Sequence, residues 1–256
     1  MTEPMTYLYA ISREPPAPEG ISGIGGEPVR VVPGEGITAL VSTVDAADFG
    51  ERGLREHLED VRWLEETARA HNRVVDAART PIAPLGLATV YLSDDRVREV
   101  LRERGAHFRA VLDRVAGRTE WGVKAYADPP AEETPPQEPE SERPGAAYLQ
   151  RARRRREFSE RSWADAVHRA ERLHADLAAF ARASRVLPPQ DRDLAGYTGR
   201  MLLNGAYLVD DERGDEFAGA VTGSADRVGL RAELTGPWPP YSFATLEDEE
   251  NAGGPR

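Results

Sequence analysis

The stretch LTGPWPPYSFA, Leu234–Ala244, closes the regular part of this chain and shapes its fold. Gly236 is expected to end a strand, and three prolines follow it, at Pro237, Pro239 and Pro240. Each proline fixes the backbone φ angle and lacks an amide donor, so the segment is predicted to be stiff, extended and unable to continue a sheet. The same stretch carries three aromatic side chains, Trp238, Tyr241 and Phe243.

Two interpretations of these aromatic side chains stay open. In the first, which we favour, they cover the edge or the end of a C-terminal sheet, because aromatic residues beside prolines usually belong to a core. In the second, they form a pre-organised aromatic surface for a partner.

Length and composition restrict the class of protein. A chain of 256 residues is long for a single hydrophobic core, so two domains are expected. The formal net charge is -11, which opposes non-specific binding to nucleic acids. There is no cysteine, which excludes disulfides and thiolate chemistry, and no apolar run approaches the ~20 residues of a membrane span. Because the first residues also lack the pattern of a secretory signal, a cytoplasmic protein is expected.

The N-terminal half combines strands and helices without a regular alternation. Short apolar runs predict strands over Thr6–Ile11, Ile37–Val44, Leu87–Leu92 and Thr119–Ala127, with one more short strand among the valines of 18–36. Apolar residues at helical spacing predict a long amphipathic helix over Leu54–Ala78, with one gap in the pattern at His71. A second helix is predicted to begin after the capping residue Ser93 and to run to Val115. The pattern is typical of an α+β domain.

An acidic, proline-rich stretch interrupts the second half at Asp128–Gly145. It holds no large apolar residue and is expected to be a mobile linker or insertion. Helical spacing then extends over as much as Ala146–Ser184, about 58 Å at 1.5 Å per residue, so a break or a protruding end is expected near the arginine run. A strand, a helix and a strand follow, at Arg200–Asp210, Phe217–Val228 and Gly229–Gly236. With the strand at Glu120–Tyr126, this half resembles a shortened ferredoxin-like unit.

These patterns predict an α+β protein of two domains, the second of them ferredoxin-like with a long amphipathic helix. The N-terminal domain is expected to span 1–118, and the C-terminal domain 119–244 with the acidic insertion at 128–145. Residues 245–256 are expected to form a disordered tail.

No arrangement of residues indicates an active site or a metal centre. The glycine-rich Gly20–Gly26 is not followed by the lysine of a phosphate-binding loop, since the single lysine is Lys124. The histidines lack the spacing of metal ligands, and the acidic clusters do not match a calcium loop. No GxSxG motif supplies a hydrolase serine. We therefore expect no enzymatic activity, no metal and no cofactor.

One basic run, RARRRRE at Arg151–Glu157, stands out in this acidic chain. The interpretation that we favour is plain solvation, with screening of the arginines by the acidic insertion. The alternative is docking of an anionic partner or a nucleic acid. A nucleic-acid surface usually interleaves aromatic residues, and here only Phe158 is close.

Four motifs together resemble the gas vesicle protein F and L family. They are MTYLYAI, GRTEWGVKAY, NGAYLVD and GLRAELTGPWPPYSF, at Met5–Ile11, Gly117–Tyr126, Asn204–Asp210 and Gly229–Phe243. They occur in the family's order over nearly the whole chain, and LTGPWPPYSF is the most specific of them. Similar sequences usually place a basic residue ahead of the stretch that here reads PLGLATVY, whereas this chain has Gly86.

The resemblance implies an accessory protein of gas vesicle formation with two α+β domains, the second a modified ferredoxin-like fold. Members are thought to bind the small hydrophobic shell protein and other accessory proteins, without enzymatic activity. Nucleic acids, membranes and small-molecule substrates are then not expected as partners. The groove between the domains or the long helix is our hypothesis for the contact surface. The motifs supply the candidate interface residues Trp121, Tyr126, Arg200, Tyr207, Trp238, Tyr241 and Phe243.

Two other functions stay open as alternatives. An enzyme would use scattered residues such as Arg200, Asp210 and His174, and perturbed pKa values in one deep pocket would favour it. A regulatory module would bind a small ligand between the domains, and a ligand-dependent rise in melting temperature would favour that.

Overall fold

The computed structural model describes residues 3–14, 20–78, 81–127, 144–189 and 200–244. The chain forms two compact units. Unit 1 comprises Met1–Glu120 together with Pro237–Arg256, and unit 2 comprises Trp121–Gly236. The closing segment from Pro237 therefore belongs with the N-terminal unit, whereas the sequence pattern placed it in the C-terminal domain.

Unit 1 is built on a sheet that, within the described residues, has five strands. They are β1 (Pro4–Ser12), β2 (Arg30–Pro33), β3 (Thr38–Asp45), β4 (Ile82–Pro84) and β5 (Val90–Tyr91). Their order is β2-β3-β1-β4, β5 also pairs with β1, and the pairs are antiparallel. The helices are α1 (Ala46–Phe49), α2 (Glu51–His57), α3 (Val61–Ala77), α4 (Asp94–Glu103) and α5 (Gly105–Val115), with single turns η1 (Ile24–Gly26) and η3 (Tyr241–Phe243).

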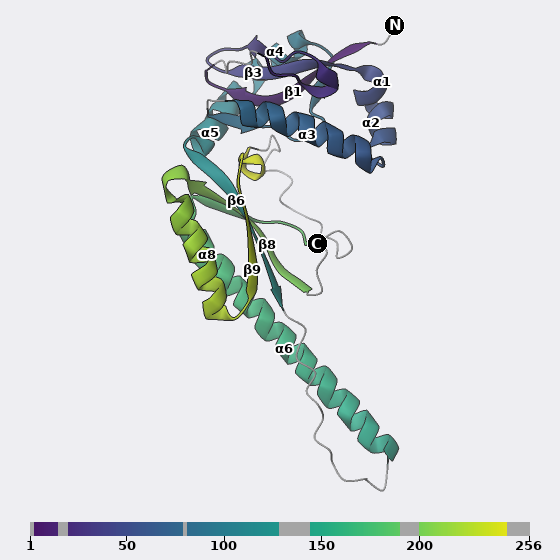
Figure 1. Ribbon diagram of the computed structural model, residues 1–256, viewed down its shortest axis with the longest axis vertical. Coiled ribbons are helices and arrows are strands. Elements are labelled where there is room, and N and C mark those ends of the chain that lie inside the picture. The colour runs from purple at the N-terminus through teal and green to yellow at the C-terminus, as the bar shows by residue number, and fades with distance from the viewer. Residues whose placement is uncertain (1–2, 15–19, 79–80, 128–143, 190–199, 245–256) are drawn as a thin grey trace. The chain divides into compact units, whose positions relative to one another are not determined.

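The central strand β1 is buried because helices cover both faces of the sheet (Figure 1). Every side chain from Thr6 to Ser12 is buried. Tyr7 reaches α3, where its hydroxyl contacts His71, whereas Thr6 donates to Asp94 at the start of α4. Successive side chains of a strand face opposite sides, so α3 and α4 cover opposite faces of the sheet. Unit 1 is thus a helix, sheet and helix sandwich.

The single helix predicted over Leu54–Ala78 is wrong, because the chain forms α2 and α3 with a break between them. Asp60 lies at the break, and its carboxylate accepts hydrogen bonds from the backbone amides of Arg62 and Trp63, at 2.9 and 3.2 Å. An aspartate in this position is a favourable N-cap, since it satisfies amides that have no partner inside the helix. The apolar spacing continues across the break and conceals it in the sequence.

The strand predicted over Leu87–Leu92 is shortened to β5, and the cause is a turn that precedes it. Ala88 has a φ angle of 63°, a left-handed conformation that is incompatible with a strand. Its amide donates to the Tyr7 hydroxyl at 3.0 Å. A side chain of the central strand therefore stabilises this turn.

The helix predicted from Ser93 is confirmed, but it is divided into α4 and α5 at Arg104. The Ser93 hydroxyl accepts from the Arg96 amide at 3.3 Å, as expected of an N-cap. The predicted apolar stripe is buried, with Val97, Leu101, Phe108, Val111 and Val115 in the core.

Unit 2 has, among its described residues, a four-stranded sheet of order β7-β8-β6-β9. Its elements are β6 (Arg118–Ala127), α6 (Pro144–Phe180), β7 (Ala183–Val186), β8 (Arg200–Asp210), η2 (Asp211–Arg213), α8 (Gly214–Val228) and β9 (Arg231–Trp238). The succession of strands and long helices is βαββαβ, which is the succession of the ferredoxin-like motif. β7 completes this succession and was not predicted, because its four residues, ASRV, carry no apolar run.

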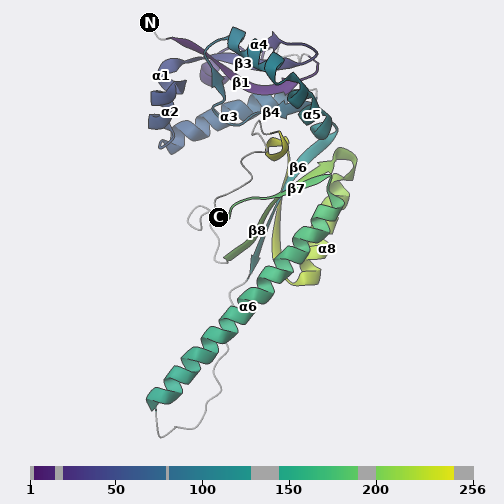
Figure 2. The same ribbon diagram turned by 180° about the vertical axis from the view of Figure 1, so that it is seen from behind.

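The two long helices of unit 2 pack together against its sheet (Figure 2). Leu173 and Leu177 of α6 meet Phe217 and Val221 of α8 in a core that also contains Tyr207 of β8. All five side chains are at most 3% exposed. Burial of such side chains contributes roughly 1.5–3 kcal/mol each, so this contact accounts for much of the stability of unit 2.

α6 is one continuous helix of 37 residues, about 55 Å long at 1.5 Å per residue. Of the two expected outcomes near the arginine run, the helix shows the protruding end, because the side chains from Ala152 to Arg161 are all exposed. Pro144 and Gly145 already belong to this helix. The rest of the predicted insertion, 128–143, and the predicted tail, 245–256, lie outside the described residues.

β9 continues to Trp238, two residues past the predicted end at Gly236. Pro237 is compatible with this strand because β9 lies at the edge of the sheet, where proline is tolerated.

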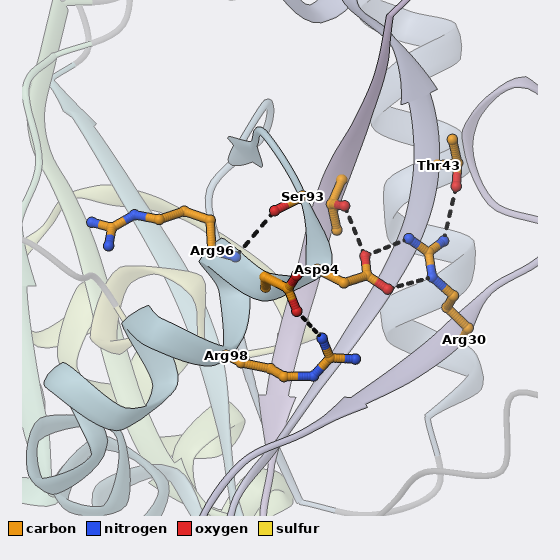
Figure 3. A network of polar contacts seen from close by, with 8 residues as sticks. Arg30, Thr43, Ser93, Asp94, Arg96 and Arg98 are labelled. Carbon is orange, nitrogen blue, oxygen red and sulfur yellow. Dashed lines mark hydrogen bonds and ion pairs between the residues drawn. The ribbon is translucent and has the colours of Figure 1, made fainter.

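A network of polar contacts ties α4 to the sheet of unit 1 (Figure 3). Arg30 of β2 donates to both carboxylate oxygens of Asp94, at 3.1 and 2.6 Å, and to the Thr43 hydroxyl of β3 at 3.0 Å. Thr6 of β1 donates to the same carboxylate at 2.8 Å. The hydrogen bonds from Arg30 lower the pKa of Asp94. One carboxylate thus connects two strands to the first turn of a helix.

We predict that Asp94→Asn lowers the free energy of unfolding by about 1–3 kcal/mol at neutral pH, because the half-buried Arg30 loses its charged partner. Chemical denaturation measures this difference. The pKa of Asp94 is lower in the folded protein than in the unfolded chain. The stabilisation is therefore present above the ordinary aspartate pKa and is lost as pH falls through the lowered value. The gap between wild type and variant should narrow on acidification.

Asp95→Asn is the matched control, since Asp95 is exposed and pairs with Arg98 within the same helix. Its effect should stay below about 0.5 kcal/mol. Equal losses from the two substitutions would contradict a special role for Asp94.

Candidate partner interface

Three of the candidate interface residues are buried or partly buried in unit 2, two of them in or against its core. Tyr207 is fully buried, with its hydroxyl 2.8 Å from Nδ1 of His174. Tyr126 is also buried and donates to Glu233 at 3.2 Å. Trp121 is partly buried against the same core as Tyr207. The two tyrosines can therefore influence a partner only through the shape of the unit.

Arg200 is exposed at the start of β8, with its guanidinium carbon 3.8 Å from the ring centre of Trp163 on α6. This is a cation–π contact that fixes the strand to the helix. Asp210 accepts from Arg182 at 2.8 Å, and His174 contacts the core tyrosine named above. The residues of the alternative enzyme hypothesis are thus engaged with different partners and do not converge on one pocket.

Neither a cluster of metal-ligating residues nor a membrane-spanning helix is found in the described part of the chain. No group of three or more histidine, aspartate and glutamate residues in it is placed to hold a metal ion. None of its helices combines the length and the apolar character that crossing a membrane requires.

The closing segment packs into unit 1, which corrects the expectation that its aromatics cover the C-terminal sheet. The Tyr241 hydroxyl donates to Asn72 of α3 at 2.8 Å. The amide and the hydroxyl of Ser242 donate to the Glu120 carboxylate at 2.7 and 2.6 Å. Phe243 is 2% exposed. A turn at the end of the chain is therefore part of the N-terminal core.

The closing segment meets unit 1 at a buried histidine, His71 of α3. The rings of Tyr7, Tyr9 and Tyr241 surround it, with centres 5.5 to 5.8 Å from the imidazole. Burial raises the pKa of Tyr7, so this phenol stays protonated. Its oxygen already accepts from the Ala88 amide, and its proton is therefore free to be donated to Nδ1 of His71 at 3.0 Å.

Burial lowers the pKa of His71 to about 4, and a hydrogen bond with the Leu85 backbone offsets only part of that effect. The imidazole is therefore neutral at physiological pH. In the sequence, His71 was visible only as a gap in the apolar spacing of its helix. Nothing in the sequence connected it with Tyr241, which lies 170 positions further along the chain.

Exposed apolar side chains offer surfaces for a partner. Leu58 and Val61, at the turn between α2 and α3, are 58% and 76% exposed. Trp63 is half-buried against the core of unit 1 and stacks on His57, with ring centres 4.7 Å apart. We call Leu58 and Val61 the apolar corner. Trp238, one of the candidate interface residues, is mostly exposed, at 54%.

Gly86, where similar sequences usually have a basic residue, is exposed in unit 1. No atom lies within 4 Å of the position that a Cβ would take there. A basic side chain would therefore fit at this position without a steric conflict.

We predict that acidification destabilises unit 1 through His71. Its folded pKa of about 4 lies below the ordinary value of 6.5, so the unfolded chain binds the proton more readily between these values. Stability is full above pH 6.5 and falls as pH drops toward 4, by at most about 1.4 kcal/mol per pH unit. Denaturation midpoints over this range should show a shallower pH dependence in His71→Gln. His57→Gln is the control, and an unchanged slope in His71→Gln would contradict the assignment.

We also predict that Trp238 and Tyr241 differ in their contributions to stability. Tyr241→Ala should lower the free energy of unfolding by about 2–4 kcal/mol, because a half-buried ring and its hydrogen bond to Asn72 are lost. Trp238→Ala should cost less than about 1 kcal/mol, since most of this side chain is exposed. Circular dichroism during chemical denaturation measures both, and similar losses would contradict the placement of Tyr241 in the core.

The family model described as gas vesicle synthesis protein GvpL/GvpF matches residues 5–245. Gas vesicle protein L of a Streptomyces species is 42% identical over 97% of this chain and 96% of its own length. Gas vesicle protein F1 of Halobacterium salinarum is 27% identical over 99% of this chain and 100% of its own length.

Solved structures agree at the level of the fold. The crystal structure of the gas vesicle protein GvpF from Anabaena sp. PCC7120 superposes with a TM-score of 0.65 at 20% identity, covering 96% of this chain and 98% of that one. GvpF from Microcystis aeruginosa gives a TM-score of 0.63 at 20% identity, covering 94% and 99%. The α+β class predicted from the sequence is thereby confirmed. By the match of its family model over residues 5–245, this chain belongs to the GvpL/GvpF family of gas vesicle synthesis proteins.

Proposed function

We propose that this protein is a non-enzymatic accessory factor of gas vesicle assembly that binds the hydrophobic shell protein and other accessory proteins. The observation that carries the proposal is the family match over residues 5–245, which includes both units. A gas vesicle role follows from the family, and we place the protein in the cytoplasm at growing vesicles. Binding and holding of shell subunits is the part that we add.

The physical reason for a holding role is the chemistry of the shell subunit that the family resemblance implies. An amphipathic, aggregation-prone polypeptide exposes apolar surface and strand edges until it is incorporated. A partner that covers such surface needs exposed apolar side chains of its own on a soluble, charged body. The apolar corner offers them in unit 1, with Leu58 and Val61 largely exposed. The net charge of -11 keeps a complex of this kind dispersed.

The proposal of a non-enzymatic role is supported by the separation of the polar residues that an enzyme would need. Arg200, Asp210 and His174 contact different side chains, as described above. The polar network around Arg30 and Asp94 connects strands to a helix start. The donors of Arg30 and the acceptors of Asp94 form hydrogen bonds within the network, which is typical of a structural role.

The proposal predicts that the chain keeps the shell protein soluble. Tagged protein is co-expressed with the small shell protein, and the soluble fraction and the pull-down are compared with and without the tagged chain. We expect the shell protein to appear in the soluble fraction and to be recovered with the tag. Shell protein that stays insoluble and unbound would reject the holding role and direct attention to other accessory proteins.

Variants of exposed apolar residues locate the contact. Leu58→Glu combined with Val61→Glu should abolish co-purification, because two charges at the apolar corner would lose hydration on binding. Leu92→Glu is the matched control, since Leu92 is as exposed as Val61, at 76%, but belongs to a different part of unit 1. Retained binding by the double variant would place the contact elsewhere.

A further inference from the structure

The N-terminal end of α6 is a helical arm without cover among the described residues. We call Gln150–Arg161 the arm. Moving along the helix toward this end, Trp163 still holds Arg200, and Ala166 is the last buried side chain. Arg169 of α6 donates to the carbonyls of Val228 and Gly229 at the C-terminal end of α8. Beyond these contacts α6 continues for several turns (Figure 1). Its side chains from Ala152 to Arg161 are exposed.

The arm reverses the charge of the protein locally. From Ala152 to Arg161 it carries five arginines and two glutamates, in a chain with a formal net charge of -11. Two of the arginines form ion pairs one turn apart, Arg153 with Glu157 and Arg156 with Glu160. Such pairs stabilise an exposed helix by about 0.3–0.5 kcal/mol each, so they help the arm to remain helical without tertiary packing.

The remaining arginines are available to a partner. Arg154, Arg155 and Arg161 form no ion pair or hydrogen bond from their side chains within the described part of the chain. Two of them line up with an aromatic residue, since Arg154, Phe158, Arg161 and Asp165 follow one another at spacings of four, three and four. Residues at these spacings form one ridge along a helix.

The ridge has the composition of a docking surface. Phe158 is 50% exposed between two arginines. The ridge lies about a third of a turn around the helix axis from the buried stripe that continues through Ala166, at 100° per residue. Phe158 is therefore not placed to be buried against the sheet, and packing there does not explain an aromatic residue at this position. An apolar anchor between flanking cations is the pattern that an amphipathic acidic helix complements.

We propose that the arm binds an acidic amphipathic helix of a partner protein, laid along the ridge of Arg154, Phe158 and Arg161. This inference deepens the proposed function, on which it rests, by naming the chemistry of an accessory partner distinct from the hydrophobic shell protein. Carboxylates of the partner pair with the free arginines, and an apolar side chain of the partner covers Phe158. Long-range attraction directs the partner to the arm, because the rest of the chain repels it.

The size of the arm favours a short acidic segment over other anions. From Gln150 to Arg161 the helix spans about 18 Å at 1.5 Å per residue. A duplex or an anionic membrane extends well beyond this length and would be brought close to the acidic remainder of the protein. A helix of matching length avoids this repulsion.

The test measures binding of a fluorescein-labelled designed peptide to the full-length protein by anisotropy. The peptide has about 16 residues, which covers the arm with about one turn to spare, with leucine at alternating spacings of three and four and glutamate beside each leucine. We expect saturable binding that weakens as salt is added. Arg154→Glu combined with Arg161→Glu should weaken it at least about tenfold, and Phe158→Ala by about three- to tenfold.

Controls separate the arm from general electrostatics. Arg52→Glu combined with Arg62→Glu removes the same charge from exposed arginines of unit 1 and should change the affinity less than about twofold. Arg154→Gln with Arg161→Gln should also weaken binding, which shows that the effect does not depend on introduced repulsion or a disturbed helix. Circular dichroism verifies that each variant keeps its helix content.

Three results would overturn the inference. They are no peptide binding at low salt, equal binding by wild type and the arm variants, and tighter binding of a DNA duplex or of anionic phospholipid vesicles than of the peptide. The shell protein takes no part in this measurement, so its outcome is distinguishable from that of the co-expression experiment.

Discussion

The hydrogen bond between the Tyr7 hydroxyl and Nδ1 of His71 organises unit 1. It joins the central strand to α3, and the same hydroxyl accepts from Ala88 and so determines the turn ahead of β5. The ring of Tyr241 then packs on the imidazole and brings the closing segment into the same core. Because all of these groups are buried or partly buried, loss of one leaves others without a partner, which is costly in a low-dielectric interior.

This arrangement gives the end of the chain a structural role in its first unit. Ser242 is held by Glu120 through two hydrogen bonds, so unit 1 is complete only when the chain has passed through unit 2 and returned. The rigid prolines of the closing segment suit this task, since they reduce the entropy that is lost when the segment is ordered. The most specific motif of the family thus has a packing explanation that requires no partner.

Local patterns in the sequence predicted most elements, and contacts between distant residues account for the differences. The stretch RMLLNGAYLVD was predicted as a strand, which β8 confirms with the same bounds, Arg200–Asp210. The apolar spacing predicted one helix across Asp60, whereas Asp60 is the N-cap at which a new helix begins. The break was missed because a single polar residue carries little weight in a periodic pattern. The aromatic candidates Tyr126 and Tyr207 were predicted from motifs, which do not separate core residues from surface residues. Tyr241 was assigned to the wrong unit because no local pattern reports a contact with His71.

The exposed surfaces of the two units differ in chemistry, and this difference bears on function. The apolar corner of unit 1 presents aliphatic side chains, whereas the arm of unit 2 presents arginines around one aromatic ring. An apolar polypeptide gains little from the arm, since binding there would remove hydration from arginines without supplying carboxylates. An acidic helix gains little from the apolar corner, because binding there would remove hydration from its carboxylates without supplying cations. Two partners of different chemistry can therefore be recognised by one chain without competing, which is the property that an assembly factor with several partners requires.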